Sequence, residues 1–343
     1  MKAYTVIKSL LTSCGLFPVC LLLACTEPPQ AQAELVLGTI CRINLYEYGS
    51  PQLYGTLFSR LREIEMTMSI TMADTAVAKI NQNAGIRPVP VPLDLMEVLD
   101  QALAYAALSE GAFDPTVGPL VQRWAIGSEH PRVPEAAEIE EALSLINWQD
   151  VVIDRDAATV FLRRSGMALD LGAIAKGYAA DEIAKILQRA RVTGAIIDLG
   201  GNIVAYGAKQ RGLPWSIGIQ NPLDSRGTYL GIFAIQHKSI VTSGVYERYA
   251  EIEGKRYHHI LSTQDGYPVY NGLLSVTIIA DRSIDADALS TTAFALGYEK
   301  GRALVESVDH AEALFIFEDK RIQGTPGALA QFTLRDTQFR LIP

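Results

Sequence analysis

Residues 170–189 have the sequence DLGAIAKGYAADEIAKILQR. Apolar residues recur at helical spacing from Ile174 onward, so we predict a helix over residues 174–189, opened by Asp170. A strand over residues 195–199 follows it. The first turn is built almost wholly of small residues, which let another group approach the backbone closely. This helix and strand are the clearest local prediction in the chain.

Strands and helices are mixed along the rest of the sequence without a regular βαβ alternation. This mixture predicts the α+β class rather than a doubly wound sheet. No change of composition marks an internal boundary, so one domain is expected over residues 35–343. The further predicted helices cover residues 53–68, 93–109, 138–146 and 287–305, and the predicted strands cover 35–48, an extended 87–92, a hairpin of 151–153 with 159–163, and short runs between 215 and 279.

The composition excludes several classes of protein. The chain has 343 residues, of which 49% are hydrophobic and 20% charged, so it can bury a sizeable core. Its formal charge is −8 and it has no Lys/Arg-rich run, which makes nucleic-acid binding unexpected. The cysteines stand at 14, 20, 25 and 41, without a CxxC pair. A metal would therefore be held by oxygen or imidazole.

The N-terminus is predicted to be a secretory signal peptide, residues 1–24. Lys2 and Lys8 precede an apolar stretch that is too short for a comfortable transmembrane helix. The stretch ends in Leu-Leu-Ala-Cys25, which resembles a bacterial lipobox. We expect Cys25 to carry lipid and residues 25–34 to form a tether. The alternative is an ordinary signal cut elsewhere, which would leave a soluble periplasmic protein.

Two glycine-bearing segments are candidates for ligand binding. Residues 111–120, GAFDPTVGPL, form a loop in which Phe113 could cover a planar ligand and Asp114 could accept from its polar edge. The alternative is that Asp114 and the following proline only start a helix. Lys176 lies near a helix N-terminus that suits a phosphate, although close helix packing would demand the same small residues. The Gly-Gly-Asn202 turn permits a ligand or a plain turn equally well.

Two further clusters carry polar chemistry. Asp287 and Thr291 are i and i+4 on a predicted helix, so their oxygens share a face. Such hard ligands suit Mg²⁺, and waters and phosphates complete the coordination of the ion. The alternative is that Asp287 is a helix cap. His258 and His259 are adjacent on a strand, so at most one faces a given site as a candidate general acid or base, although a histidine bonded to backbone is more common.

Taken together and in this order, the segments resemble the ApbE family, the FAD:protein FMN transferases that also include Mg²⁺-dependent FAD pyrophosphatases. The resemblance runs from about residue 37 to at least 297. It rests on GAFDPTVGPL, DLGAIAKGYAAD, the Gly-Gly-Asn turn, PWSIGIQNP at 214–222, VTSGVYERY at 241–249, YHHI at 257–260 and DALSTT at 287–292.

The resemblance implies an α+β fold related to the T-fold, with a largely antiparallel sheet around a flavin cleft. It implies FAD as substrate and His259 as a proton carrier. The Mg²⁺ ligands it implies are Ala173, Asp287 and Thr291. The implied flavin or nucleotide contacts are Leu37, Thr71, Ala112, Phe113, Asp114, Asp170, Lys176, Leu261 and Ser290.

The implied reaction moves FMN from FAD to a Ser or Thr hydroxyl of an acceptor flavoprotein, such as a membrane redox-pump subunit, and releases AMP. If water attacks instead, the protein is a FAD pyrophosphatase; a flavin-binding lipoprotein without turnover is the third hypothesis. Thr71 stands where transferases commonly have an aromatic residue, and Leu37 where many members have Met. The expected location is the bacterial cell envelope, lipid-anchored and facing the periplasm.

Overall fold

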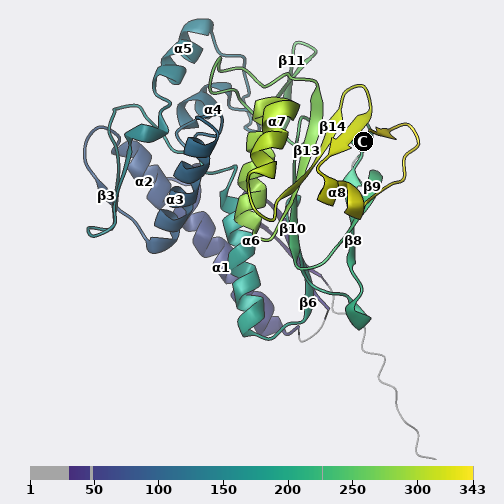
Figure 1. Cartoon of the computed structure of the whole chain (residues 1–343). Helices are drawn as coiled ribbons and strands as arrows, with labels where there is room; N and C mark the ends of the chain where they lie inside the picture. Colours follow the sequence, from purple (N-terminus) through teal and green to yellow (C-terminus); the bar gives the residue numbers. More distant parts are fainter. Residues whose placement is uncertain (1–30, 47–48, 226, 343) are drawn as a thin grey trace, which may run out of the picture.

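The computed structural model describes residues 31–46, 49–225 and 227–342. The predicted signal peptide and Cys25 lie outside the described residues. The described chain is built on a nine-stranded sheet (Figure 1). Neighbouring strands are antiparallel, except β15 and β17. In sheet order the strands are β1 (Gln32–Val36), β2 (Thr39–Leu45), β6 (Gly194–Leu199), β7 (Asn202–Gly207), β10 (Lys238–Gly244), β13 (Leu273–Ala280), β14 (Glu312–Phe317), β15 (Arg321–Gly324) and β17 (Arg340–Leu341).

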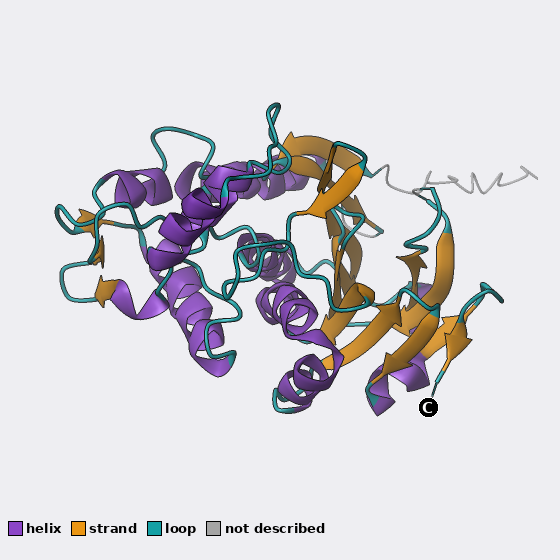
Figure 2. Cartoon of the chain, turned by 90° about the horizontal axis from the view of Figure 1, so that it is seen from above, coloured by secondary structure: helices purple, strands orange, loops and turns teal. Residues whose placement is uncertain are grey.

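The two faces of this sheet are covered by different layers (Figures 1 and 2). Helices cover one face, and a three-stranded sheet with a short helix covers the other. Strand β13 is buried along its whole length, with Val276 and Ile278 toward the helices and Ile279 toward the small sheet, as a strand covered on both faces requires. The covering elements are α1 (Pro51–Met68), α3 (Leu93–Leu108), α6 (Ala175–Arg189) and α7 (Ser283–Glu306), and on the other side β8 (Trp215–Gln220), β9 (Tyr229–Ile235), β16 (Phe332–Leu334) and α8 (Pro326–Gln331).

The remaining elements lie beyond the helix layer or at the ends of the sheet. A two-stranded hairpin, β11 with β12, stands apart from the large sheet. These elements are α2 (Ala76–Gln82), α4 (Gly118–Trp124), α5 (Ala136–Ser144), the sheet of β3 (Val89–Pro90), β5 (Thr159–Leu162) and β4 (Val151–Asp154), the hairpin of β11 (Tyr249–Ile252) and β12 (Lys255–His258), and the 3-10 turns Trp148–Asp150 and Gln210–Gly212.

Most of the predicted elements are confirmed, and so is the α+β class. Helices α1, α3, α5 and α6 lie within two residues of their predicted bounds, and β4 and β5 form the predicted hairpin. Helix α7 starts four residues before the predicted 287, at Ser283, and breaks at Gly297, whose φ is 78° and ψ 178°. Asp170 does not cap α6, because the N-cap is Ile174 and Asp170 instead accepts from the Gly172 amide at 2.7 Å.

The single strand predicted over residues 35–48 is wrong. The chain forms a hairpin there, in which Val36 pairs with Thr39 across a two-residue turn. Leu37 and Gly38 both have positive φ, 56° and 65°, as the tight turns of twisted hairpins require. Alternation alone did not indicate the turn, because leucine rarely adopts this conformation. Strand β1 also begins at Gln32, inside the segment predicted as a tether.

Among the helices of the described residues, none combines the length and the apolar character needed to span a bilayer.

Candidate active site

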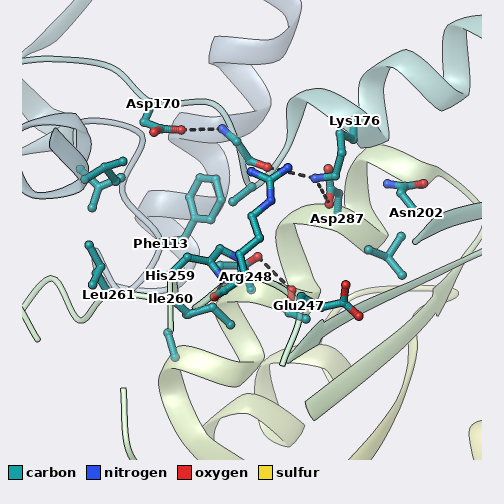
Figure 3. A pocket seen from close by; sticks show the side chains of 18 of the residues that line it. Phe113, Asp170, Lys176, Asn202, Glu247, Arg248, His259, Ile260, Leu261 and Asp287 are labelled. Carbon is teal, nitrogen blue, oxygen red and sulfur yellow. Dashed lines mark hydrogen bonds and ion pairs between the residues drawn. The ribbon is translucent and has the colours of Figure 1, made fainter. Parts of the chain in front are cut away.

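A cavity of about 370 Å³ opens between the ends of the central strands and helices α4, α6 and α7 (Figure 3). Its apolar part is lined by Phe113, Val121 and Leu261. Its polar part is lined by residues of α6, α7 and the strand ends, among them Lys176 and Asp287. A cavity with one apolar part and one polar, hydrogen-bonding part suits a ligand that has a flat ring and a charged, polar group.

Helices α6 and α7 touch backbone to backbone beside this cavity. A Cβ on Gly177 would lie 2.4 Å from the Ser283 carbonyl oxygen and 2.8 Å from the Asp287 Cβ, so only glycine fits. Asp181 of α6 accepts hydrogen bonds from the amides of Ser283 and Ile284, at 2.7 and 3.0 Å, and so holds the start of α7. These contacts fix the position of the Asp287 carboxylate, which is 3% exposed.

The same contact changes the hydrogen bonding at the start of α6. The Gly177 amide donates to Asp287 Oδ2 at 2.9 Å. In a regular helix it would donate to the Ala173 carbonyl, four residues back. No amide of the described residues donates to that carbonyl instead. Ala173 therefore presents an oxygen without an internal donor at the cavity wall, next to Asp287.

The donor set around this oxygen fits a hard divalent cation. Asp287 supplies a carboxylate, Ala173 a carbonyl and Thr291 a hydroxyl, and all three residues line the cavity. Oxygen donors in small number are what Mg²⁺ takes when substrate phosphates complete its coordination. The described residues contain no cluster of three or more His, Cys, Asp or Glu that could hold a metal without a substrate.

His259 also lines the cavity, and it is held by the backbone. Its Nδ1 is 3.0 Å from the Arg248 carbonyl oxygen, which can only accept, so Nδ1 carries the proton and Nε2 keeps a lone pair. Burial, together with the charges of Arg248 and Lys176, lowers the pKa of His259 to about 4. The imidazole is therefore a neutral base at physiological pH.

The adjacent histidine has a different role, as the strand geometry predicts. His258 is buried, donates from Nε2 to the Val269 carbonyl at 2.9 Å, and accepts from the Ile260 amide at Nδ1. Burial lowers the pKa of His258 as well. His258 does not line the cavity, so only His259 faces it.

Two further carboxylates of the cavity, Asp114 and Asp170, accept hydrogen bonds from nearby backbone amides. Asp114 accepts from the Thr116 amide and hydroxyl, both at 2.7 Å, and from the Trp148 amide at 3.0 Å. It braces the loop rather than capping α4, whose N-cap is Val117. Burial raises the pKa of Asp114 and of Asp170, although the Gly172 amide, Arg248 and Lys176 oppose the shift at Asp170.

Ten of the site residues named from the sequence line this one cavity, although they come from four separate segments of the chain. They are Ala112, Phe113, Asp114, Asp170, Ala173, Lys176, His259, Leu261, Asp287 and Thr291.

Three predicted contacts do not lie in the cavity wall. Leu37 sits in the β1–β2 turn and packs against the core, while its neighbour Gly38 reaches the cavity. Thr71 is exposed, and its hydroxyl bonds that of Ser69 at 3.0 Å. Ser290 is fully buried behind the wall, where its hydroxyl bonds the Asp287 carbonyl at 2.9 Å and supports the helix.

The polar residues of the cavity that were not assigned a role from the sequence include Arg248 and Asn202. Arg248 extends into the cavity near His259 (Figure 3), and among the described residues no ion pair of its side chain is found. Asn202 is 1% exposed, and its Nδ2 has no hydrogen-bond partner among the described residues. Figure 3 draws Asn202 on the same side of the view as Lys176 and Asp287.

The orientation of Asn202 is set by a chain of hydroxyl groups. The Ser239 hydroxyl donates to Ser283 Oγ at 2.9 Å, and the Ser283 hydroxyl donates to Asn202 Oδ1 at 2.7 Å. The amide nitrogen is thereby left as a donor, and an unsatisfied buried donor costs about 1–3 kcal/mol unless a ligand uses it. Two sequence signals could have pointed to these residues: the segment VTSGVYERY contains Arg248, and the Gly-Gly-Asn turn contains Asn202.

Comparisons with known proteins agree on one family. The sequence model of the ApbE family matches residues 37–315. The FAD:protein FMN transferase of Treponema pallidum (strain Nichols) is 39% identical over 329 residues, which cover 91% of each chain. The FAD:protein FMN transferase of Klebsiella pneumoniae (strain 342) is 36% identical over 310 residues, 90% of this chain and 96% of the relative.

Solved structures give the same result. The crystal structure of the ApbE protein from Thermotoga maritima superposes with a TM-score of 0.81 at 32% identity and covers 88% of this chain and 98% of that chain. The flavin transferase ApbE from Vibrio cholerae superposes with a TM-score of 0.76 at 28% identity, over 90% of this chain and 97% of that chain.

Proposed function

The chain belongs to the ApbE family, and from this we propose that it is a FAD:protein FMN transferase. It moves FMN from FAD to a Ser or Thr hydroxyl of an acceptor flavoprotein and releases AMP. The observation that carries the proposal is the meeting, in one cavity, of the free Ala173 carbonyl, Asp287 and Thr291 with the neutral imidazole of His259.

His259 is the general base in this proposal. Its Nε2 removes the proton of the acceptor hydroxyl as the hydroxyl oxygen forms a bond to the FMN phosphorus. The bond between that phosphorus and the bridging oxygen breaks, and AMP leaves with the electron pair. The Arg248 carbonyl keeps the base in the required tautomer by accepting from Nδ1.

The cavity also supplies donors for the negative charge of the diphosphate. Lys176 is held between the Gly172 carbonyl at 3.1 Å and Asp287 Oδ1 at 3.5 Å, so its ammonium group lies beside the proposed cation site. Asn202 Nδ2 and the Arg248 guanidinium are further donors. Preorganised donors of this kind stabilise charge that develops as the phosphoryl group is transferred.

Mg²⁺ is the proposed metal, held by Ala173, Asp287 and Thr291. When bound, it supplies a positive charge that neutralises the diphosphate. Phe113 and Leu261 are placed to cover a flat ring at the apolar end of the cavity.

The proposed location follows from the sequence of the N-terminus. A signal peptide over residues 1–24 and a lipid on Cys25 would anchor the protein in the bacterial cell envelope, facing the periplasm. An acceptor such as a membrane redox-pump subunit would then lie within reach of the tether.

The test is to incubate the protein with FAD, Mg²⁺ and the flavin-accepting domain of a membrane redox-pump subunit. Flavin fluorescence on the acceptor should survive denaturing electrophoresis, AMP should appear in equal amount, and chelation of the metal should stop both. Free FMN accumulating without labelled acceptor would show hydrolysis instead. FAD bound without any AMP would show a flavin-binding protein without turnover.

A further inference from the structure

The β11–β12 hairpin lies at the top of the molecule in Figure 1, and the residues that flank it, Arg248 and His259, line the cavity. Arg248 directly precedes β11, and His259 directly follows β12. The His259 amide donates to the Arg248 carbonyl at 3.1 Å, so the hydrogen-bond ladder of the hairpin runs down to the cavity. The hairpin is therefore connected to the proposed base without an intervening loop.

The register of the hairpin tells which backbone groups face outward. Antiparallel pairs alternate between hydrogen-bonded and non-hydrogen-bonded ones. Because the His259 amide bonds the Arg248 carbonyl, the next pair, Tyr249 with His258, is non-hydrogen-bonded, and so is Glu251 with Arg256. The amides and carbonyls of Tyr249 and Glu251 thus point away from β12, toward the outer side of β11.

The two outer edges of the hairpin differ. The edge of β12 is covered, because the Tyr270 hydroxyl donates to the Arg256 carbonyl at 2.7 Å and the Val269 amide donates to the Ile260 carbonyl at 3.0 Å. On the edge of β11, no residue of the described chain makes a hydrogen bond to the backbone of Tyr249 or Glu251 apart from the hairpin itself. The β11 edge is open.

The other sheet edge that reaches the cavity is protected. The turn at Gly38 ends β1, but its amide donates to Glu65 of α1 at 3.3 Å. Glu34 of β1 forms an ion pair with Arg62 of the same helix. Charged cover of this kind is how proteins block pairing at an edge. Strand β17 lies at the far end of the sheet order from β1.

We propose that the outer edge of β11 is the docking site of the acceptor protein, which adds an extended segment there as a further strand. The inference rests on the proposed function. Main-chain pairing provides affinity with little demand on side chains, and it leaves the modified side chain free to enter the cavity. At about 3.3 Å per residue, a strand paired with Glu251 reaches the level of Arg248 and His259 within about 10 Å.

A proline at residue 251 tests the edge without disturbing the ladder. The Glu251 amide points outward, so Glu251→Pro removes a donor from the edge and adds a bulky ring, which edge strands tolerate. The matched control is Arg256→Pro, directly across the hairpin, which keeps the carbonyl that Tyr270 bonds. Glu251→Gln controls for the lost charge.

We expect Glu251→Pro to weaken binding of the flavin-accepting domain, and to raise the KM for it, by about tenfold or more, the equivalent of one or two lost main-chain hydrogen bonds. FAD binding, followed by flavin fluorescence, should stay at the wild-type level. Arg256→Pro and Glu251→Gln should bind the acceptor as the wild type does. Unchanged acceptor binding in Glu251→Pro would overturn the docking site.

A second measurement does not depend on the folding of a variant. Synthetic peptides of the accepting segment, N-methylated at one amide at a time, should lose binding at alternate positions on one side of the modified residue. Loss at every position, or at none, would also overturn the docking site. Acceptor binding with this alternation but without covalent flavin would leave the docking site standing and overturn the proposed function.

Discussion

The two walls of the cavity are built in opposite ways. The wall formed by α6 and α7 is buried, and its polar groups are fixed by backbone contacts, such as the Gly177 amide on Asp287 and the pair of amides on Asp181. The wall formed by Arg248 and His259 belongs to a short hairpin that projects into solvent, and Arg248 is exposed.

This difference matches two different kinds of ligand. A diphosphate with a divalent cation is bound in the same arrangement in every turnover, so a rigid, preorganised wall recognises it best. A protein acceptor needs an accessible surface and a base that can be approached from outside. We infer that the helical wall serves FAD and the hairpin wall serves the acceptor.

The largest effect is expected at the helical wall, from Asp287→Asn. The amide oxygen of asparagine can still accept from the Gly177 amide, so the fold should persist. The negative charge of the carboxylate that would hold the proposed cation is lost. AMP release at saturating FAD should fall about 1,000-fold, more than the loss of an outer-shell partner of a metal site costs. Asp281→Asn, an exposed carboxylate paired with Lys238, is the control and should be active. A Mg²⁺ titration identical to the wild type would contradict the ligand assignment.

His259→Gln should have the next largest effect, at the hairpin wall. Loss of a general base should lower transfer about 100-fold or more, while FAD binding persists. The pKa of His259 in the protein without substrate is about 4, so the neutral imidazole dominates above this pH. The wild-type kcat/KM should therefore decline only as the pH falls through about 4. His130→Gln, an exposed histidine, is the control. An acid limb near the usual pKa of histidine would argue against the lowered pKa of His259.

The parts of the site that were predictable from the sequence are those set by local geometry. Asp287 and Thr291 could be paired because i and i+4 always share a helix face. Strand alternation limited the site to one of His258 and His259, because strand neighbours point to opposite faces, and the family resemblance chose His259. The helix over residues 174–189 could be placed because its apolar period is strong.

The remaining features depend on contacts between distant segments. The free carbonyl of Ala173 exists only because Gly177 donates to α7, and no local pattern encodes that choice; the family resemblance alone pointed to this residue. Arg248 reaches the cavity because β11 folds back on β12 and brings it next to His259. The turn at Leu37 was missed because it relies on a leucine in a left-handed conformation.

Gly177→Ala should disturb the helical wall by a smaller amount. The new methyl group would meet the Ser283 carbonyl at 2.4 Å, so α6 and α7 must separate. We expect a loss of about 2 kcal/mol in the free energy of unfolding, with weaker Mg²⁺ binding, as overpacking usually costs. The control is Gly55→Ala in α1, where nothing lies within 4 Å of the added Cβ. It should stabilise the helix by up to about 1 kcal/mol. Equal urea midpoints for the two variants would show that the α6–α7 contact is not tight.

The last effect, which is on stability and its pH dependence alone, concerns Asp181, which joins the same two helices. Burial raises its pKa to about 6, although the amides of Ile284 and Ser283 oppose the shift. Between its ordinary pKa near 4 and this value, the folded state binds more protons than the unfolded state, so stability should fall as the pH rises from about 4 to about 6 and then level off. In Asp181→Asn this decline, of about 2 kcal/mol between the two pH values, should be absent from urea unfolding curves measured at pH 4.5 and 6.5. The same pH dependence in the wild type and in Asp181→Asn would show that the carboxylate is exposed to water. The helical wall would then not be more rigid than the hairpin wall.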